Sequence, residues 1–299
     1  MAHIISQKFR GTGVALVTPF NNDNSVDFNG LKKLVNFQID NGIDYLVVMG
    51  TTGESPTVSS SEKQQIIDCV KEANNGRLPL MLGMGSNNTL ELVEALKKQD
   101  FSGFSVVLSV SPYYNKPNQN GIVAHYTMVA DASPLPVLLY NVPGRTGSNI
   151  STETTLKLAA HPNIFGTKEA SGNFNQCMEI IQQRPADFAV ISGDDAFTLP
   201  FIAMGMDGVI SVMGNGYPRK FSSMVKLALE GKIEAARVLH YELLDAMNLI
   251  FADGSPGGIK VLLEAQGICG KTVRMPLHDV SETVKQQLLK TMDNAKAKA

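Results

Sequence analysis

The lysine at position 168 lies in the stretch NIFGTKEASG, residues 163–172, where an apolar run ends and a polar loop containing glycine begins. A lysine at the end of a strand is most often solvated, because lysine side chains are almost never fully buried. A lysine that is partly removed from water, however, loses its proton more readily and can attack a carbonyl group. Lys168 is therefore either a solvated surface residue or a nucleophile, and the polar residues elsewhere in the chain help to decide between the two.

Polar residues follow four other apolar runs in the same way. They lie in GTTGES (50–55), SPYYNKP (111–117), YNVPGRTG (140–147) and SGDD (192–195). If the runs are barrel strands, their carboxyl ends meet at one mouth and the polar groups share it. The groups that would meet there belong to Thr51, Thr52, Tyr113, Tyr114, Tyr140, Arg145 and Lys168. Such a set suits an organic acid with a carbonyl group, since a guanidinium and the amides of a turn bind carboxylates.

Several of these residues also have a purely structural explanation. Arg145 could be a surface arginine in a turn, and Gly50 and Gly53 could merely turn the chain. One of the two tyrosines at 113 and 114 could be a core aromatic. A barrel without catalytic activity, such as a sensor or a scaffold, would not need an amine, an arginine and several hydroxyls at one rim. We therefore favour an enzyme over a binding or scaffold protein.

The carboxylates Glu54, Asp194 and Asp195 could in principle hold a metal ion. The five histidines have no ligand spacing, and a pair of carboxylates alone is a weak signal, so we predict no metal. The sequence also has no G-x-x-x-x-G-K-[ST], no G-x-G-x-x-G before a helix and no G-x-S-x-G. P-loop nucleotide hydrolysis, dinucleotide binding and the common serine hydrolases are therefore not expected.

Eight short apolar or β-branched runs alternate with segments of helical periodicity. The runs are apolar at consecutive positions, which is typical of parallel strands covered by helices on both faces. Ser59 before Glu62 and Asn88 before Glu91 are helix-start signals. The sequence therefore predicts a (β/α)₈ TIM barrel. The eight runs are residues 13–20, 44–50, 78–85, 104–110, 135–142, 163–170, 188–194 and 207–215.

After residue 215 the strand signals stop, and three segments with helical patterns follow. They are residues 220–251, 257–266 and 279–297, and no linker rich in Pro, Gly or Ser precedes them. We expect a barrel catalytic domain over residues 1–222 and a C-terminal helical domain over residues 223–299.

The composition limits the partners and the compartment. A formal net charge of −2 without a basic run gives nucleic acid or an anionic membrane little to bind. No apolar stretch approaches the length of a membrane span, and the N-terminus has no apolar signal region. Cys69, Cys177 and Cys269 are far apart and form no C-x-x-C pair. We therefore expect a cytoplasmic protein whose partners are small molecules or other copies of itself.

Five motifs in register carry a resemblance to a known family. The segments GTTGES, YYNKP, YNVPGRTG, GTKEASG and SGDD resemble those of the dihydrodipicolinate synthases, in the class I pyruvate-aldolase superfamily that also contains N-acetylneuraminate lyase. The resemblance extends from about residue 8 to the C-terminal helices. It implies an imine between a lysine and pyruvate, condensation with L-aspartate 4-semialdehyde, and the first committed step of diaminopimelate and lysine biosynthesis. It implies no cofactor, because the protonated imine itself accepts the electrons.

The resemblance also assigns catalytic roles to residues of this chain. Lys168 forms the imine, and Tyr140 is the general acid and base that moves protons. Thr51 connects Tyr140 to Tyr114, and the tyrosine at that position in the family reaches in from a neighbouring subunit. The proton relay is then complete only in an oligomer, and we expect a homotetramer built from dimers.

The remaining roles concern the substrates. Thr52 and the neighbouring amides hold the carboxylate of pyruvate, Arg145 binds the carboxylate of the second substrate, and backbone groups of Gly193 and Ile210 line the pocket. Arginine at position 145 favours aspartate semialdehyde as the acceptor. The alternative is an N-acetylneuraminate lyase or a 2-keto-3-deoxy sugar-acid aldolase with the same imine chemistry. It is less favoured because these enzymes typically lack an arginine at this position.

A possible feedback site for lysine is also implied by the resemblance. Its positions here are Ser55, Ser60, Lys63, Asn87, Glu91 and Tyr113, of which Asn87, Glu91 and Tyr113 fit the family. Ser60 and Lys63 stand where lysine-sensitive members commonly have histidines. Because the Lys63 ammonium would oppose the ammonium groups of the ligand, we expect lysine to inhibit weakly or not at all.

Overall fold

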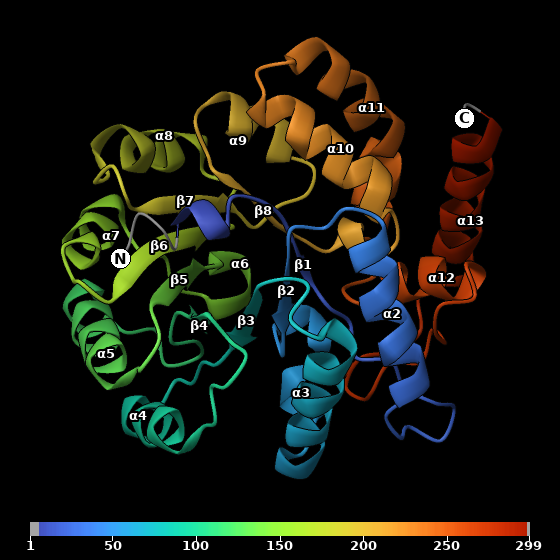
Figure 1. Ribbon diagram of the computed structural model, residues 1–299. Coiled ribbons are helices and arrows are strands. Elements are labelled where there is room, and N and C mark those ends of the chain that lie inside the picture. The colour runs from blue at the N-terminus through green and yellow to red at the C-terminus, as the bar shows by residue number, and fades with distance from the viewer. Residues whose placement is uncertain (1–5, 298–299) are drawn as a thin grey trace.

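The computed structural model describes residues 6–297, and eight parallel strands form a closed barrel at its centre (Figure 1). Each strand pairs with the next along the chain, and β8 closes the ring by pairing with β1. The predicted fold is confirmed. The strands are β1 Gly11–Ala15, β2 Tyr45–Val48, β3 Leu80–Gly83, β4 Val106–Val110, β5 Val137–Asn141, β6 Ile164–Glu169, β7 Ala189–Ser192 and β8 Gly208–Ser211.

Seven of these strands lie inside the runs predicted from the sequence, whereas β1 begins two residues before its run, at Gly11. The prediction also extended the first strand to Phe20. Pro19 has no N–H to donate to a neighbouring strand, and the chain turns away after Ala15 instead. The apolar residues Leu16, Val17 and Phe20 are nevertheless buried in the core.

Helices surround the barrel and cover the outer face of its strands (Figure 1). Ser59 begins α3 with the predicted capping box: its hydroxyl accepts from the amide of Glu62 at 3.3 Å, and its own amide donates to the Glu62 carboxylate at 2.9 Å. Asn88 begins α4 by accepting from the Glu91 amide at 3.3 Å. The helices that follow the strands are α2 Phe28–Asp40, α3 Ser60–Asn74, α4 Thr89–Lys98, α5 Gln119–Ala132, α6 Pro143–Thr146, α7 Thr152–Ala159, α8 Phe174–Gln183, α9 Thr198–Ala203 and α10 Pro218–Leu229.

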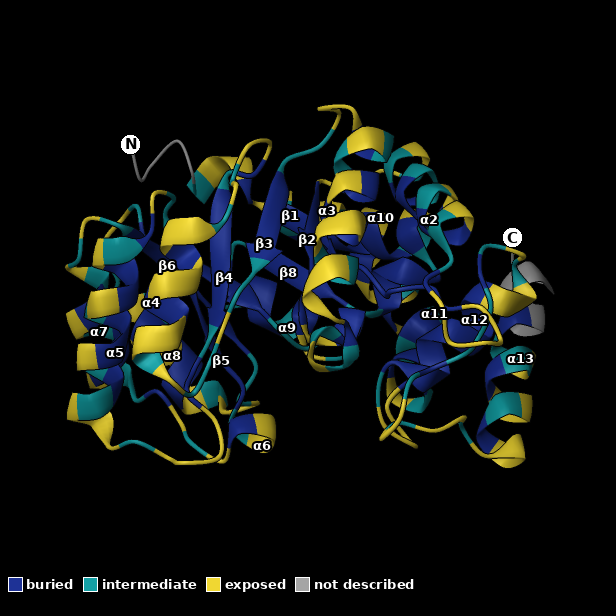
Figure 2. Cartoon of the chain, turned by 90° about the horizontal axis from the view of Figure 1, so that it is seen from below, coloured by how far each residue is buried: buried dark blue, intermediate teal, exposed yellow. Residues whose placement is uncertain are grey.

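The strands are buried on both faces, as the consecutive apolar positions predicted. One layer of the core fills the barrel, where Tyr45, Val47, Met81, Ile191 and Ile210 pack together. A second layer lies between the strands and the helices. Figure 2 shows the strands almost entirely buried, whereas the helices are exposed on their outer faces. A rigid packed barrel of this kind fixes the positions of the residues at its strand ends.

The C-terminal extension contains α11 Ile233–Leu249, α12 Gly257–Ala265 and α13 Glu282–Ala297. The single helical segment predicted over 220–251 is two helices, because the chain turns at Gly231, whose φ of +77° is in the region that favours glycine. The predicted domain boundary after residue 222 falls within α10, which packs against β1. The division of the chain stays a prediction, and a boundary in the turn at 230–232 leaves α10 with the barrel.

Among the residues that the structure describes, no helix combines the length and the apolar character that crossing a membrane requires.

Candidate active site

Lys168 and Tyr140 are neighbours on adjacent strands. Tyr140 of β5 and Lys168 of β6 are paired in register near the carboxyl ends of their strands. The Lys168 Nζ lies 4.2 Å from the centre of the Tyr140 ring. Lys168 is only 6% exposed and Tyr140 only 7% exposed. The interpretation of Lys168 as a solvated residue at a strand end is therefore wrong, and an amine is held beside a phenol inside the barrel mouth.

Gly193 leaves room for the Lys168 side chain. A Cβ atom at position 193 would lie 2.9 Å from Lys168 Cε and 2.6 Å from Ala170 Cβ, which is closer than side chains tolerate. The Gly193 amide donates to the carbonyl of Glu169 at 2.8 Å, so the backbone after β7 lies directly against β6. Ile210 of β8 is buried in the same interior cluster as Tyr140. Gly193 thus lies against Lys168, and Ile210 lies in the barrel interior.

Thr51 and Thr52 form a tight turn after β2. The turn is the 3₁₀ helix η1 Thr51–Gly53, and the first amides of a helix have no partner within it. Thr52 is buried, whereas Thr51 is exposed in the single chain. The Thr18 hydroxyl donates to the Gly53 carbonyl at 2.6 Å and fixes the end of the turn to the segment after β1. Amides and hydroxyls in this arrangement can bind a carboxylate.

Arg145 lies in the short helix α6 that follows β5, and it is exposed. Its amide donates to the Val142 carbonyl at 2.9 Å, so the chain forms a tight turn directly after β5. Arg145 is five residues after Tyr140. An exposed guanidinium in the loop after β5 is accessible to a second anionic substrate. Its role in binding such a substrate stays a prediction.

Neither Tyr113 nor Tyr114 is a core aromatic, so that interpretation is wrong for both. Tyr113 is 39% exposed and Tyr114 is 88% exposed. Tyr114 has a φ of +72°, a left-handed conformation that is uncommon outside glycine. Within the chain as described, no hydrogen bond or ring contact joins Tyr114 to Tyr140. Tyr114 is therefore accessible on the surface of the single chain.

The candidate carboxylates are held by protein groups. Asp195 accepts from the Ser211 hydroxyl at 2.5 Å and from the amides of Val212 and Met213 at 3.1 and 2.8 Å. Burial raises the pKa of Asp195 to about 6. Glu54 is buried in an ion pair with Lys260. Across residues 6–297, no cluster of three or more His, Cys, Asp or Glu side chains could hold a metal ion.

Two residues that sequence reasoning missed lie directly behind the catalytic candidates. Asn141 and Glu169 follow Tyr140 and Lys168, are paired in register, and point to the other face of the sheet. The Asn141 Nδ2 donates to both carboxylate oxygens of Glu169 at 3.1 Å. Glu169 also accepts from the amide of Ser171 at 2.8 Å, and burial raises its pKa. Polar residues inside two apolar runs were the signal that could have identified this pair.

The residues of the possible effector site follow three neighbouring strands. Ser55 begins the 3₁₀ helix η2 Ser55–Thr57 after β2, Asn87 and Glu91 follow β3, and Tyr113 follows β4. The Asn115 side chain donates to the Asn87 carbonyl at 3.1 Å and joins two of these loops. Ser60 and Lys63 lie in the first turn of α3, after η2. All six residues belong to the loops and helix starts at the carboxyl ends of β2, β3 and β4.

A buried lysine beside a tyrosine, at the carboxyl ends of strands in a closed (β/α)₈ barrel, defines the class of protein as a lyase of the class I aldolase type. Comparison with known proteins identifies the family. The family model described as "Dihydrodipicolinate synthetase family" matches residues 8–295. The chain belongs to this family, as its motifs predicted.

Individual relatives agree with the family. The 4-hydroxy-tetrahydrodipicolinate synthase of Flavobacterium psychrophilum is 56% identical over 283 residues, which are 94% of this chain and 97% of the relative. A dihydrodipicolinate synthase from Acinetobacter baumannii, solved in complex with pyruvate, is 36% identical with a TM-score of 0.93, covering 96% of this chain and 99% of that one. The enzyme from Cyanidioschyzon merolae, solved with lysine bound, is 40% identical with a TM-score of 0.92, covering 97% and 99%.

Proposed function

We propose that this protein is a 4-hydroxy-tetrahydrodipicolinate synthase, which condenses pyruvate with L-aspartate 4-semialdehyde in the first committed step of diaminopimelate and lysine biosynthesis. The observation that carries the proposal is the buried Lys168 amine, 4.2 Å from the centre of the Tyr140 ring. The names of the relatives support the reaction, and the pyruvate complex of one of them supports the first substrate.

The proposed reaction begins when the Lys168 Nζ attacks the ketone carbon of pyruvate and water leaves, which gives a protonated imine. The imine withdraws electrons from the adjacent methyl group, which loses a proton and becomes the enamine carbon. That carbon attacks the aldehyde of the second substrate, whose oxygen takes up a proton and becomes a hydroxyl. The amino group of the second substrate then displaces Lys168, which closes the ring and releases the amine.

Tyr140 is the group best placed to move these protons, because its phenol is on the strand next to Lys168. We assign the pyruvate carboxylate to Thr52 and the amides of its turn, and the carboxylate of the second substrate to Arg145. Gly193 and Ile210 line the pocket. No cofactor is required, since the protonated imine accepts the electron pair.

The assembly that we propose is a homotetramer of tight dimers, in which Tyr114 of one subunit approaches Thr51 and Tyr140 of the other. Two observations support this arrangement: Tyr114 is 88% exposed in the single chain, and Thr51 is exposed as well. A two-fold axis between the two barrel mouths would bring Tyr114 of each subunit to Thr51 of the other. The cytoplasm suits such an enzyme, because its three cysteines are free and buried.

Weak or absent inhibition by lysine is the regulatory behaviour that we propose. The C. merolae relative was solved with lysine bound, so the family includes members that bind it. In this chain the Lys63 ammonium, in the first turn of α3, adds a positive charge that opposes a cationic ligand. A lysine titration of the condensation rate tests this, and strong inhibition below about 1 mM would contradict the charge argument.

The direct test of the function is an assay of the purified protein with pyruvate and L-aspartate 4-semialdehyde, in which product is detected by mass spectrometry. A parallel assay measures the cleavage of N-acetylneuraminate. We expect condensation to be the faster reaction by several orders of magnitude. Faster cleavage of the sugar acid would transfer the assignment to a sialic acid lyase, with the same imine on Lys168.

A further inference from the structure

Lys260 of α12 is a completely buried lysine, and it forms an ion pair with the equally buried Glu54. The Lys260 Nζ lies 2.5 Å from Glu54 Oε1, donates to the Thr272 carbonyl at 2.7 Å, and lies 4.4 Å from the centre of the Phe20 ring. Burial lowers the pKa of Lys260, and the Glu54 carboxylate opposes this effect. The pair joins the C-terminal helices to the turn that contains Thr51 and Thr52.

Glu54 is the residue at which that turn ends and the next one begins. Its amide donates to the Thr51 carbonyl at 3.1 Å, and its carbonyl accepts from the Thr57 amide at 2.9 Å. Its φ of +54° is in the left-handed region, which glycine adopts more easily than glutamate. The backbone therefore does not favour glutamate here. The side chain, through its contact with Lys260, accounts for the residue type.

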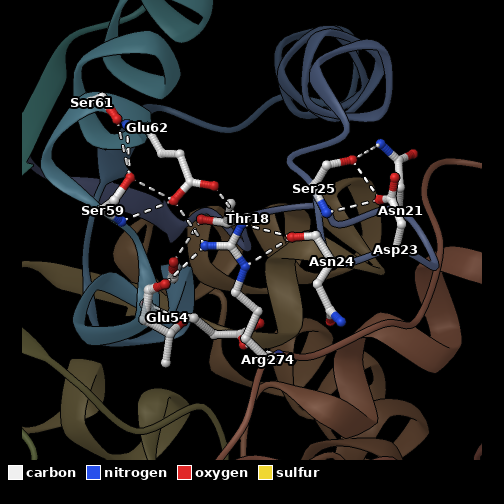
Figure 3. A network of polar contacts seen from close by, with 12 residues as sticks. Thr18, Asn21, Asp23, Asn24, Ser25, Glu54, Ser59, Ser61, Glu62 and Arg274 are labelled. Carbon is white, nitrogen blue, oxygen red and sulfur yellow. Dashed lines mark hydrogen bonds and ion pairs between the residues drawn. The ribbon is translucent and has the colours of Figure 1, made fainter.

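Arg274 strengthens the connection from the same C-terminal segment. Its amide donates to the second carboxylate oxygen of Glu54 at 2.9 Å, and its guanidinium donates to the Thr57 carbonyl at 2.8 Å. The guanidinium also forms an ion pair with Glu62 at 2.5 Å and donates to the Asn24 carbonyl at 2.7 Å. Figure 3 shows Arg274 reaching between Glu62 and Asn24, with Glu54 beside it. The C-terminal segment thus holds Glu54, where the Thr51–Gly53 turn ends, and Thr57, where the next turn ends.

Stability alone does not explain such a pair. A buried ion pair can often be replaced by apolar residues without loss of stability, because removing two charges from water is costly. The pair does fix the position of Glu54, because each of the two buried charges needs the other close by. The residue that it fixes, Glu54, follows Thr52 by two positions and is the C-cap of the Thr51–Gly53 turn.

We propose that Glu54 and Lys260 are positioning residues that hold the Thr51–Thr52 turn in place to receive the carboxylate of pyruvate, so that the C-terminal helices take part in substrate binding. This inference rests on the proposed function, because that function assigns the pyruvate carboxylate to the turn. A displacement of the turn by about 1 Å is expected to weaken pyruvate binding and to leave the second substrate, bound at Arg145, little affected.

The test compares Glu54→Gln/Lys260→Met, which removes both charges, with Glu54→Asp, which keeps both charges but shortens the carboxylate side chain by one methylene. The matched control is Lys220→Met, which removes the ion pair between Lys220 of α10 and Glu242 of α11. Thermal unfolding is measured for each variant, together with kcat and KM for both substrates. Variants that remove the charge of Glu54 or of Lys260 alone are avoided, because they leave the other buried charge without a partner.

We expect the KM for pyruvate to rise on the order of tenfold in both test variants, with the KM for the semialdehyde changed by less than about twofold. The double variant should unfold near the temperature of the wild type, and the control should match the wild type throughout. An unchanged KM for pyruvate in either folded test variant overturns the proposal. If the wild-type protein forms no borohydride-stable adduct with pyruvate, the proposed function fails instead.

Discussion

Apolar side chains of the barrel interior lie on one side of Lys168, and the Tyr140 ring lies on the other. Ile191 is the register partner of Lys168 on β7, and Ile210 and Val142 belong to the same interior cluster as Tyr140. In such surroundings an electrostatic interaction is stronger than in water. A carboxylate held by Thr52 and an imine on Lys168 would therefore attract each other, and the apolar walls would keep water from the intermediate.

Arg145 is the residue that distinguishes the proposed acceptor. We expect Arg145→Ala to lower kcat/KM for the semialdehyde roughly 10- to 100-fold, because a charge-assisted pair with its carboxylate is lost. Formation of the imine with pyruvate should be little affected. Steady-state kinetics and borohydride trapping separate the two effects, with Arg237→Ala on an exposed face of α11 as the control. Equal losses in both measurements would contradict a role in acceptor binding.

Gly193 tests the geometry around Lys168. Since a Cβ atom at this position would lie 2.9 Å from Lys168 Cε, Gly193→Ala must displace the lysine side chain. We expect kcat/KM to fall on the order of 100-fold, with less adduct trapped per minute. Gly270→Ala is the control, because a Cβ atom there has only an ordinary contact at 3.5 Å with the Phe20 carbonyl. A fully active Gly193→Ala enzyme would show that this close approach is not needed for catalysis.

At the scale of elements, buried polar side chains tie the carboxyl ends of neighbouring strands together. Asn141 joins β5 to Glu169 of β6. Asp195 joins the end of β7 to the end of β8. Asn215 donates to the Ala15 carbonyl of β1 at 2.8 Å. These contacts hold the rim in register, so that residues from different strands keep their relative positions.

Asp195 gives this layer a measurable dependence on pH. Burial raises its pKa to about 6 from an ordinary value of 3.8, so the folded protein binds the proton more tightly than the unfolded chain does. Stability should therefore rise, relative to Asp195→Asn, as the pH falls from 7 toward 4, by up to about 3 kcal/mol. Urea unfolding of both proteins at several pH values measures the difference. A difference that stays constant, or that grows with rising pH, would contradict the argument.

The strands were predictable from the sequence, whereas the ties between them were not. Consecutive apolar residues in a run such as 135–142 can only be a strand or a buried helix segment, and the flanking turns decide between these. Lys168, Tyr140 and Gly193 could be proposed because they lie near the carboxyl ends of such runs. Glu54, Asn215 and Lys260 could not, since their partners are as much as 206 residues away. In the sequence, a buried charge looks the same as a solvated one.

At the scale of the whole molecule, the C-terminal helices are continuous with the barrel rather than appended to it. α11 packs against α10 and α9, and α13 packs against α11 and α12 (Figure 1). The Lys260 contact extends this connection to Glu54, at the end of the Thr51–Gly53 turn. Sequence patterns predicted the helices themselves, but they contained no information about which part of the barrel the helices contact.

The proposed dimer makes activity depend on association. If Tyr114 serves the active site of its neighbour, dilution should reduce the specific activity before it unfolds the chain. Activity across a dilution series, followed by analytical sedimentation at the same concentrations, tests this expectation. Circular dichroism reports on the fold at each step. A monomer with the full specific activity would show that Tyr114 is not shared between subunits.

The central claim is that Lys168 forms an imine with pyruvate. Incubation of the protein with pyruvate and borohydride, followed by digestion and peptide mapping, tests the chemistry and the residue in one measurement. We expect one reduced pyruvate adduct per chain on the peptide that contains Lys168, no adduct in folded Lys168→Ala, and normal trapping in Lys97→Ala, whose lysine is exposed on α4. An adduct on a different lysine, or no adduct in the wild-type protein, would contradict the account.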